Sequence, residues 1–152
     1  MDYIKIQSDA LKCLSYKNND VRYFEEERNI LFFPDQYRGY RIPKSLFFLD
    51  TGKIKEFRGG EPIFNNTFPG HIAYDTEILK PSKNLLGNPK NKKLHVFKLD
   101  NGDEMLFSEN LMKTIKPGKG EQFEYRTDGK NKIMKVYSGE ICVAVIMPVM
   151  HK

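Results

Sequence analysis

The most regular alternation of apolar and polar positions lies in the second half of the chain. Strand-forming residues at 94–99 and 105–107 flank the turn sequence Asp-Asn-Gly-Asp, whose Asn-Gly pair tolerates the positive φ angles of a two-residue hairpin turn. Ser108 is a good helix N-cap, and apolar residues between 111 and 115 form one face of a short helix. Pro117 then ends this helix. The stretch predicts a β-hairpin followed by a short amphipathic helix.

Apolar segments elsewhere predict more strands than helices. Residues 3–6 predict a short strand, after which Ser8 is the expected N-cap of a helix that ends near Tyr16. The unbroken apolar run at 141–147 predicts a strand that is covered on both faces. Shorter apolar segments predict a helical or extended element at 44–49 and further strands at residues 21–25, 30–33, 37–42, 72–79, 122–126 and 132–137.

The segment at 57–70 is rich in glycine, proline and asparagine, and it predicts a connector between a first half at 1–56 and a second half at 71–152. Residues 40–53 and 104–119 share a pattern of strand, polar hinge, four largely apolar residues and a Gly-Lys stop. Chance similarity and a duplicated unit both agree with this pattern. We expect an α+β fold of two related half-domains with antiparallel sheets and short helices, joined into one compact domain.

Composition and charge narrow the range of protein classes to which the chain could belong. A chain of 152 residues with 39% hydrophobic residues is long enough for one ordinary domain with a real core. The net charge is +5, and residues 113–152 carry 8 basic and 4 acidic side chains, a net of +4. This bias suits nucleic acid or an acidic protein partner, although an excess spread over a surface also serves solubility. The sequence opens without an apolar leader and its longest apolar run, 141–149, is too short to cross a bilayer, so we expect a cytoplasmic protein with no membrane partner.

The sequence holds no recognisable pattern of catalytic or metal-binding residues. Its three histidines are isolated, and Cys13 and Cys142 lie far apart in stretches that predict small buried side chains. No nucleophile motif and no phosphate-binding glycine loop occurs. We therefore expect no cofactor, no metal and no enzymatic activity, although carboxylates could still assemble into a catalytic pair in the folded chain.

Residues 37–41 combine aromatic side chains with arginines. Tyr37 and Tyr40 could stack on bases while Arg38 and Arg41 contact phosphates. The alternative is an ordinary alternating strand with one packed face and one solvated face. Both interpretations stay open from the sequence.

The closing segment resembles that of a known family. The sequence Ala-Val-Ile-Met-Pro-Val-Met at 144–150 is similar to the last strand of bacterial DNA sliding clamps, the beta subunit of DNA polymerase III, which ends with Met-Pro-Met before a basic residue. The opening strand and helix, the hairpin through residues 38–41 and the doubled half-domain also resemble one clamp domain. The chain is far shorter than a three-domain clamp, and His151 and Lys152 replace the family's usual basic-then-leucine end. A small prophage-encoded relative would have this size.

This resemblance implies two binding surfaces. The clamp family's helices face DNA, and the matching candidates for nonspecific phosphate contact are Lys12, Lys17, Lys113 and Lys116. The family's apolar pocket for short partner peptides would be matched by Met147, Pro148, Val149 and Met150.

Three functional hypotheses follow from these residues and from the resemblance. The first is a non-enzymatic, clamp-like replication accessory that contacts duplex DNA and partner peptides, as a monomer or a small homo-oligomer. The alternative is a phage-type protein-interaction module that inhibits a host nucleic-acid enzyme without binding DNA itself. The third is a small enzyme whose site escapes motif analysis.

Overall fold

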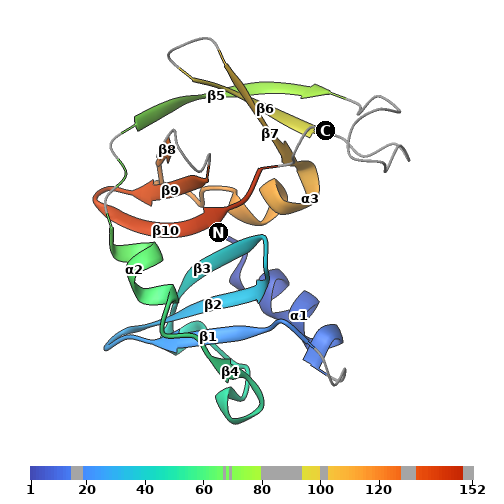
Figure 1. Ribbon diagram of the computed structural model, residues 1–152, viewed down its shortest axis with the longest axis vertical. Helices are drawn as coiled ribbons and strands as arrows, with labels where there is room; N and C mark the ends of the chain where they lie inside the picture. The colour runs from blue at the N-terminus through green and yellow to red at the C-terminus, as the bar shows by residue number, and fades with distance from the viewer. Residues whose placement is uncertain are drawn as a thin grey trace.

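The computed structural model describes residues 1–14, 19–66, 68, 70–79, 94–99, 103–127 and 133–148. Its fold is α+β, with mostly sheet and a few short helices, as the sequence predicts (Figure 1). The helices are α1 (Tyr3–Leu14), α2 (Gly60–Asn65) and α3 (Glu109–Met112), and the 3₁₀ turns are η1 (Lys44–Leu46), η2 (Thr51–Lys53) and η3 (Lys113–Ile115). The strands are β1 (Arg22–Glu25), β2 (Asn29–Asp35), β3 (Arg38–Pro43), β4 (Lys55–Glu56), β5 (Gly70–Leu79), β6 (Leu94–Leu99), β7 (Glu104–Ser108), β8 (Phe123–Thr127), β9 (Met134–Ser138) and β10 (Ile141–Ile146).

The described strands form one curved sheet of ten strands in the order β4-β1-β2-β3-β10-β9-β8-β5-β6-β7 (Figure 1). Neighbouring strands are antiparallel, except that β4 runs parallel to β1. β5 joins two parts of the sheet, because its first two residues pair with β8 and its later residues pair with β6. β3 pairs with β10, with Tyr40 opposite Ala144, so the middle of the sheet is built from distant parts of the chain.

The strands and the helix predicted between residues 94 and 115 are confirmed, and the predicted turn at 100–102 lies outside the described residues. β6 and β7 pair in register from Leu94 opposite Ser108 to Lys98 opposite Glu104. The Leu99 amide also donates to the Asp103 carbonyl oxygen at 2.8 Å, which closes the described part of the hairpin. Ser108 has the extended backbone of an N-cap, and α3 with η3 follows it directly, but its side chain makes no capping hydrogen bond.

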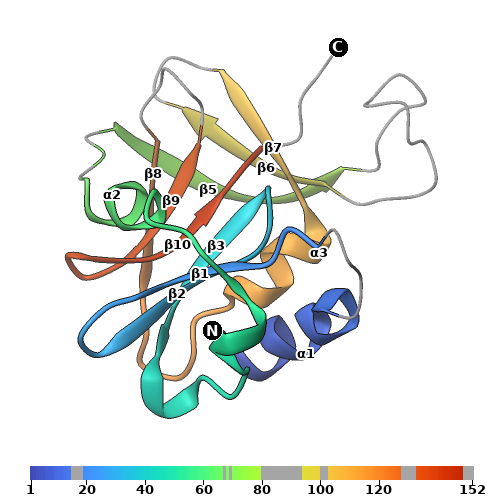
Figure 2. The same cartoon turned by 60° about the horizontal axis from the view of Figure 1, so that its bottom comes forward.

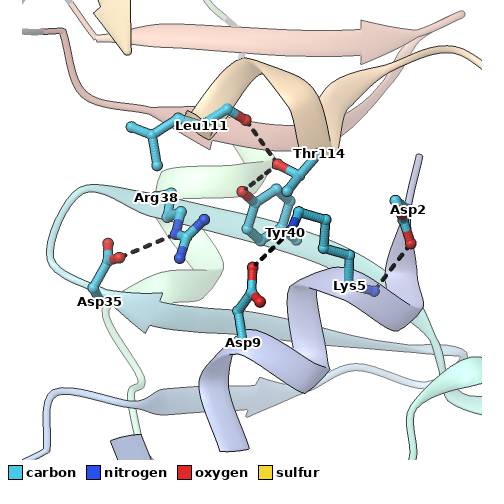
Figure 3. A network of polar contacts seen from close by, with 8 residues as sticks. All are labelled: Asp2, Lys5, Asp9, Asp35, Arg38, Tyr40, Leu111 and Thr114. Atoms are coloured by element: carbon cyan, nitrogen blue, oxygen red, sulfur yellow. Dashed lines mark hydrogen bonds and ion pairs between the residues drawn. The ribbon is translucent and has the colours of Figure 1, made fainter. Parts of the chain in front are cut away.

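The chain opens with a helix rather than with the short strand predicted at residues 3–6. Asp2 is the N-cap, since its Oδ1 accepts a hydrogen bond from the Lys5 amide at 3.0 Å (Figure 3). The buried side chains of Ile6 and Ala10 are spaced by four residues, which is the helical period and not the strand period. The prediction of Ser8 as the N-cap is therefore wrong, because the apolar period already begins before it.

The main core lies on the side of the sheet that α1 and α3 cover (Figure 2). It contains residues from both predicted halves, including Ile6 and Phe32 from the first and Phe107 and Val136 from the second. Cys142 is buried, as predicted, but Cys13 is exposed, and the prediction of a buried side chain there is wrong. Cys13 follows Ile6 and Ala10 at helical spacing, but it lies in the last turn of α1, beyond the part of the helix that is buried.

A second apolar cluster lies on the opposite face of the sheet, under α2 (Figure 2). Phe64 of α2 packs there with Phe33 of β2 and with Tyr137, Cys142 and Val145 of the central strands. The segment predicted as a connector thus contains a helix that covers the sheet. β10 contributes to both clusters, which confirms that the middle of the apolar run is covered on both faces. The ends of the run differ from the prediction, because Ile141 and Met147 are exposed.

The order of a helix followed by three antiparallel strands occurs twice. α1 precedes β1, β2 and β3, while α3 with η3 precedes β8, β9 and β10, and the sheet arranges these strands as β1-β2-β3-β10-β9-β8. The predicted repeat aligns residues 40–53 with 104–119, which correspond to β3 with η1 and to β7 with α3. The sheet does not pair these two aligned strands with each other, because β3 pairs with β10 while β7 pairs with β6.

Candidate partner-binding pocket

A cavity of about 260 Å³ opens where β10 ends, on the α2 face of the sheet. The elements around it are β1, the turn between β2 and β3, α2 and the start of β9. Its lining residues are Asp20, Arg22, Phe33, Asp35, Gln36, Tyr37, Arg38, Gly39, Phe57, Ile63, Ile133, Val145 and Met147. We call this cavity the Met147 pocket.

The floor of the Met147 pocket is aromatic. The ring of Phe33 packs edge-to-face against Phe57 at 5.1 Å and against Phe64 at 5.6 Å between ring centroids. Two glycines leave space for this ring: a Cβ on Gly39 would lie 2.6 Å from Phe33 Cε1, and a Cβ on Gly60 would lie 2.5 Å from Phe33 Cε2. Phe33 therefore lies between two backbone segments that approach its ring so closely that only glycine fits at positions 39 and 60.

One wall of the pocket is the turn between β2 and β3, which a single carboxylate organises. Asp35 accepts a hydrogen bond from Arg38 Nε at 3.0 Å (Figure 3). It also accepts one from the Tyr37 amide at 2.8 Å. Tyr37 itself lines the pocket and is 61% exposed. Asp residues favour such turns because their side chains bond to the backbone two residues further on.

The end of β10 is fixed against this turn. The Met147 amide donates to the Tyr37 carbonyl oxygen at 2.8 Å, and the Met147 side chain is 37% exposed. Among the predicted partner-binding residues, Met147 lines the pocket, and Pro148 is half-buried and follows it. Val149 and Met150 lie outside the described residues.

Polar side chains at the rim of the Met147 pocket have partners within the protein. Gln36 Nε2 donates to Asp20 Oδ2 at 3.2 Å, and the Arg22 guanidinium lies 5.4 Å from the centroid of the Phe57 ring. The floor is apolar and aromatic, and the rim carries both acidic and basic side chains. Such a pocket suits binding of an apolar side chain of a ligand better than it suits catalysis. Among the described residues no group of three or more His, Cys, Asp or Glu side chains could hold a metal ion.

The aromatic and arginine residues at 37–41 do not form one nucleic-acid surface. Tyr40 is fully buried, and its hydroxyl lies 2.8 Å from Thr114 Oγ1, which itself donates to the Leu111 carbonyl oxygen at 2.7 Å (Figure 3). Burial raises the pKa of the Tyr40 hydroxyl. Arg41 Nε forms an ion pair with Glu26 at 3.1 Å. Tyr40 therefore cannot stack on a base. The segment is a strand, as the alternative predicts, but its second face is not solvated, because Gly39 is buried and the side chains of Arg38 and Arg41 are only 15% and 11% exposed.

The predicted DNA-binding lysines lie on neighbouring elements where they are described. Lys12 is exposed on α1, Lys113 is exposed at the start of η3, and Lys116 is exposed just after η3. α1 and η3 are in contact, since the Asp2 amide donates to the Thr114 carbonyl oxygen at 3.2 Å. Lys17 lies outside the described residues.

Sequence reasoning missed the pocket's floor and most of its wall. Phe33, Phe57 and Ile63 come from three separate elements, so no single motif contains them. The sequence gives no signal of the tight packing, because the glycines at 39 and 60 are far apart in the chain and meet the same ring only in the folded protein.

Comparison with known proteins gives no assignment: no family model, no curated protein and no solved structure matches the chain. Within the part of the chain that the structure describes, no helix combines the length and the apolar character needed to cross a membrane.

Proposed function

We propose that the protein is a non-enzymatic, clamp-like binding protein that holds an apolar segment of a partner protein in the Met147 pocket. The observation that carries this proposal is an apolar pocket beside the residue that begins the clamp-like Met-Pro sequence. The pocket has an aromatic floor, a volume of about 260 Å³ and an exposed methionine at its edge. Such a site suits one or two apolar side chains of a short peptide.

The order of elements supports the clamp-like part of the proposal. Two units of a helix and three antiparallel strands meet at the pairing of β3 with β10, and their helices share one face of the sheet. We infer that these units are two related half-domains. A duplication of this kind would place the two helices side by side, as the clamp resemblance implies.

The DNA-binding part of the proposal depends on α1, η3 and the exposed lysines near them. Lys12, Lys113 and Lys116 would contact phosphates without reading sequence, and Lys17 is assigned the same role by its position after α1. With a partner in the Met147 pocket and duplex DNA along these helices, the protein would act as a cytoplasmic replication accessory.

One observation favours the alternative, a phage-type module that inhibits a host nucleic-acid enzyme and binds no DNA. Ile4 and Leu11 of α1 are 72% and 50% exposed, and Phe48 beside them is 52% exposed. Gln7 links these segments, because its Oε1 accepts from the Phe48 amide at 2.7 Å. Exposed apolar side chains suit a protein partner rather than phosphates.

The pocket can be tested with a display library of random dodecapeptides. We expect enrichment of peptides with large apolar residues, and we expect Met147→Lys to weaken their binding by about tenfold or more. Ile141→Lys is the matched control, since Ile141 is 56% exposed at the start of β10, the strand that Met147 follows, but does not line the pocket. Equal loss in both variants, or no enriched peptides, would contradict the proposal.

DNA binding is tested separately by fluorescence anisotropy with duplex DNA at low and moderate salt. We expect an affinity that falls steeply with salt and that falls further with Lys12→Glu combined with Lys113→Glu and Lys116→Glu. Lys55→Glu on the edge strand β4 is the control for one charge reversal and is compared with each single lysine variant, because Lys55 is exposed on a different element. Intact peptide binding with no DNA affinity would favour the alternative module.

A further inference from the structure

A second cavity lies apart from the Met147 pocket, between the segment α3–η3 and the strands β6 and β8. Its volume is about 410 Å³, which is within the range of small-molecule sites in proteins. None of its lining residues lines the Met147 pocket. Its polar lining is also different, because it holds a histidine and two lysines of one helical turn, whereas the basic residues of the Met147 pocket are arginines.

The apolar side of this cavity is formed by a strand and a helix. Phe123 and Tyr125 are two residues apart on β8 and line the cavity together, and Met112 and Ile115 line it from the helical segment. The Tyr125 ring packs edge-to-face on Phe97, with 5.2 Å between ring centroids, and this contact holds its orientation. Both aromatic side chains are only partly buried, so ring surface is available for a planar ligand.

The basic side of the cavity comes from η3 and the residue after it. Lys113 and Lys116 are both exposed and both line the cavity, while Glu109 is the acidic residue in the lining. These three side chains together carry a net charge of +1. Two lysines spaced by three residues on a helical turn project from one side and can approach the same anion.

His95 of β6 contributes a polar group without a charge. Burial and the nearby Lys116 lower the pKa of the His95 imidazole, while Glu109 raises it, and the net shift is downward. The imidazole is therefore neutral at pH 7 and presents one donor and one acceptor nitrogen. A neutral imidazole suits the edge of a heterocycle.

We propose that this cavity binds a nucleotide unit, with its phosphate at Lys113 and Lys116 and its base against Phe123 and Tyr125. Inorganic phosphate would use only the lysines, and an uncharged aromatic molecule would use only the rings. A nucleoside monophosphate uses both sides of the cavity. This inference depends on neither the Met147 pocket nor duplex DNA, because paired bases within a duplex could not reach the rings.

The nucleotide unit has two sources, a free nucleotide or the end of a single strand. Isothermal titration calorimetry with thymidine 5′-monophosphate, thymidine, inorganic phosphate and a 5′-phosphorylated oligothymidylate separates them. We expect the monophosphate to bind about tenfold or more tightly than thymidine or phosphate alone. Tighter binding of the oligonucleotide identifies a strand end as the source, and equal or weaker binding identifies the free nucleotide.

Variants connect the binding to this cavity. We expect Lys113→Gln with Lys116→Gln to weaken monophosphate binding about tenfold, while Lys119→Gln, exposed and outside the lining, changes it less than about twofold. Tyr125→Leu should weaken monophosphate binding more than phosphate binding, with folding checked by circular dichroism. Equal affinity for phosphate and monophosphate, equal effects of the lysine variants, or no binding at millimolar ligand would overturn the proposal.

Discussion

At the scale of single residues, the Met147 pocket depends on the position of one aromatic ring. Phe33 lies between Gly39 and Gly60, and its ring forms the floor on which a ligand would rest. Neither glycine has a positive φ angle, so it is the space and not the backbone conformation that requires glycine here. Side chains at these positions would displace the ring.

We expect Gly60→Ala to lower the free energy of unfolding by about 1–3 kcal/mol, because the new methyl overlaps the Phe33 ring. Urea denaturation followed by circular dichroism measures this change. Gly118→Ala is the control, since its methyl would meet only the flexible end of Glu121. Adding Phe33→Leu should remove the overlap, so strictly additive effects of Gly60→Ala and Phe33→Leu would contradict the contact.

The buried Tyr40 hydroxyl gives a second prediction at this scale. Thr114 uses its hydroxyl hydrogen to bond Leu111, so Tyr40 is the donor in the bond between the two side chains. Thr114→Val should lower the free energy of unfolding by about 1–3 kcal/mol, because it leaves the Tyr40 hydroxyl without this acceptor. Tyr40→Phe should lower the free energy of unfolding by only about 1 kcal/mol. Thermal unfolding compares the two variants. A larger loss for Tyr40→Phe would contradict this assignment of donor and acceptor.

The two cysteines should differ in reactivity. Burial raises the pKa of the Cys142 thiol to about 11 from an ordinary value of 9.0. The folded state therefore keeps this thiol protonated where the unfolded state ionises, and stability from this source is complete below about pH 9 and is lost as the pH rises through about 11. Iodoacetamide at about pH 8 should modify exposed Cys13 and spare Cys142, as mass spectrometry can measure. Equal modification of both residues in the folded chain would contradict this burial.

At the scale of elements, local rules predict the hairpins well. The predicted β6–β7 and β8–β9 pairs both form, while the turn residues at 100–102 and 128–132 that predicted them lie outside the described residues. The helix predicted after Ser108 also forms, although the Ser108 side chain makes no capping hydrogen bond. The start of α1 was harder to predict, because residues 3–6 contain strand-forming side chains. A cap at Asp2 and burial at every third or fourth position override that preference.

The cap of α1 can be tested directly. We expect Asp2→Ala to lower the free energy of unfolding by about 1 kcal/mol, because the Lys5 amide loses its acceptor. Asp9→Ala is the matched control: Asp9 forms only a surface ion pair with Lys5 at 3.6 Å, and we expect a loss of about 0.5 kcal/mol or less. The measurement is the midpoint of urea denaturation for both variants. Equal losses would show that Asp2 acts as a surface charge and not as a cap.

At the scale of the whole molecule, the sequence predicts the α+β class but not the order of the strands. No local sequence pattern indicates that β3 pairs with β10, since the register of that pair depends on side-chain packing in the folded core. The Met147 pocket was only partly predictable for the same reason. Met147 was found from a short sequence resemblance, whereas Phe33, Phe57 and Ile63 come together only after the sheet has formed.

The continuous sheet predicts that the two sequence halves unfold together. The main core joins Ile6 and Tyr40 of residues 1–56 with Val136 and Ile146 of residues 71–152, and the β3–β10 ladder crosses the middle of the sheet. Separating the halves would expose these side chains and the open edges of both strands, so neither half retains a complete core. We expect one cooperative transition.

Hydrogen exchange with mass spectrometry along a urea series measures this cooperativity segment by segment. The amides of β3 and β10 should lose protection with the same midpoint and the same dependence on urea, since opening either strand breaks the ladder between them. Ile146→Ala on β10 should then shift both strands equally, because this buried side chain belongs to the shared core. An Ile146→Ala effect confined to residues 71–152 would mean that the half-domains predicted from the sequence are independent folding units, and that β3 keeps its structure without β10.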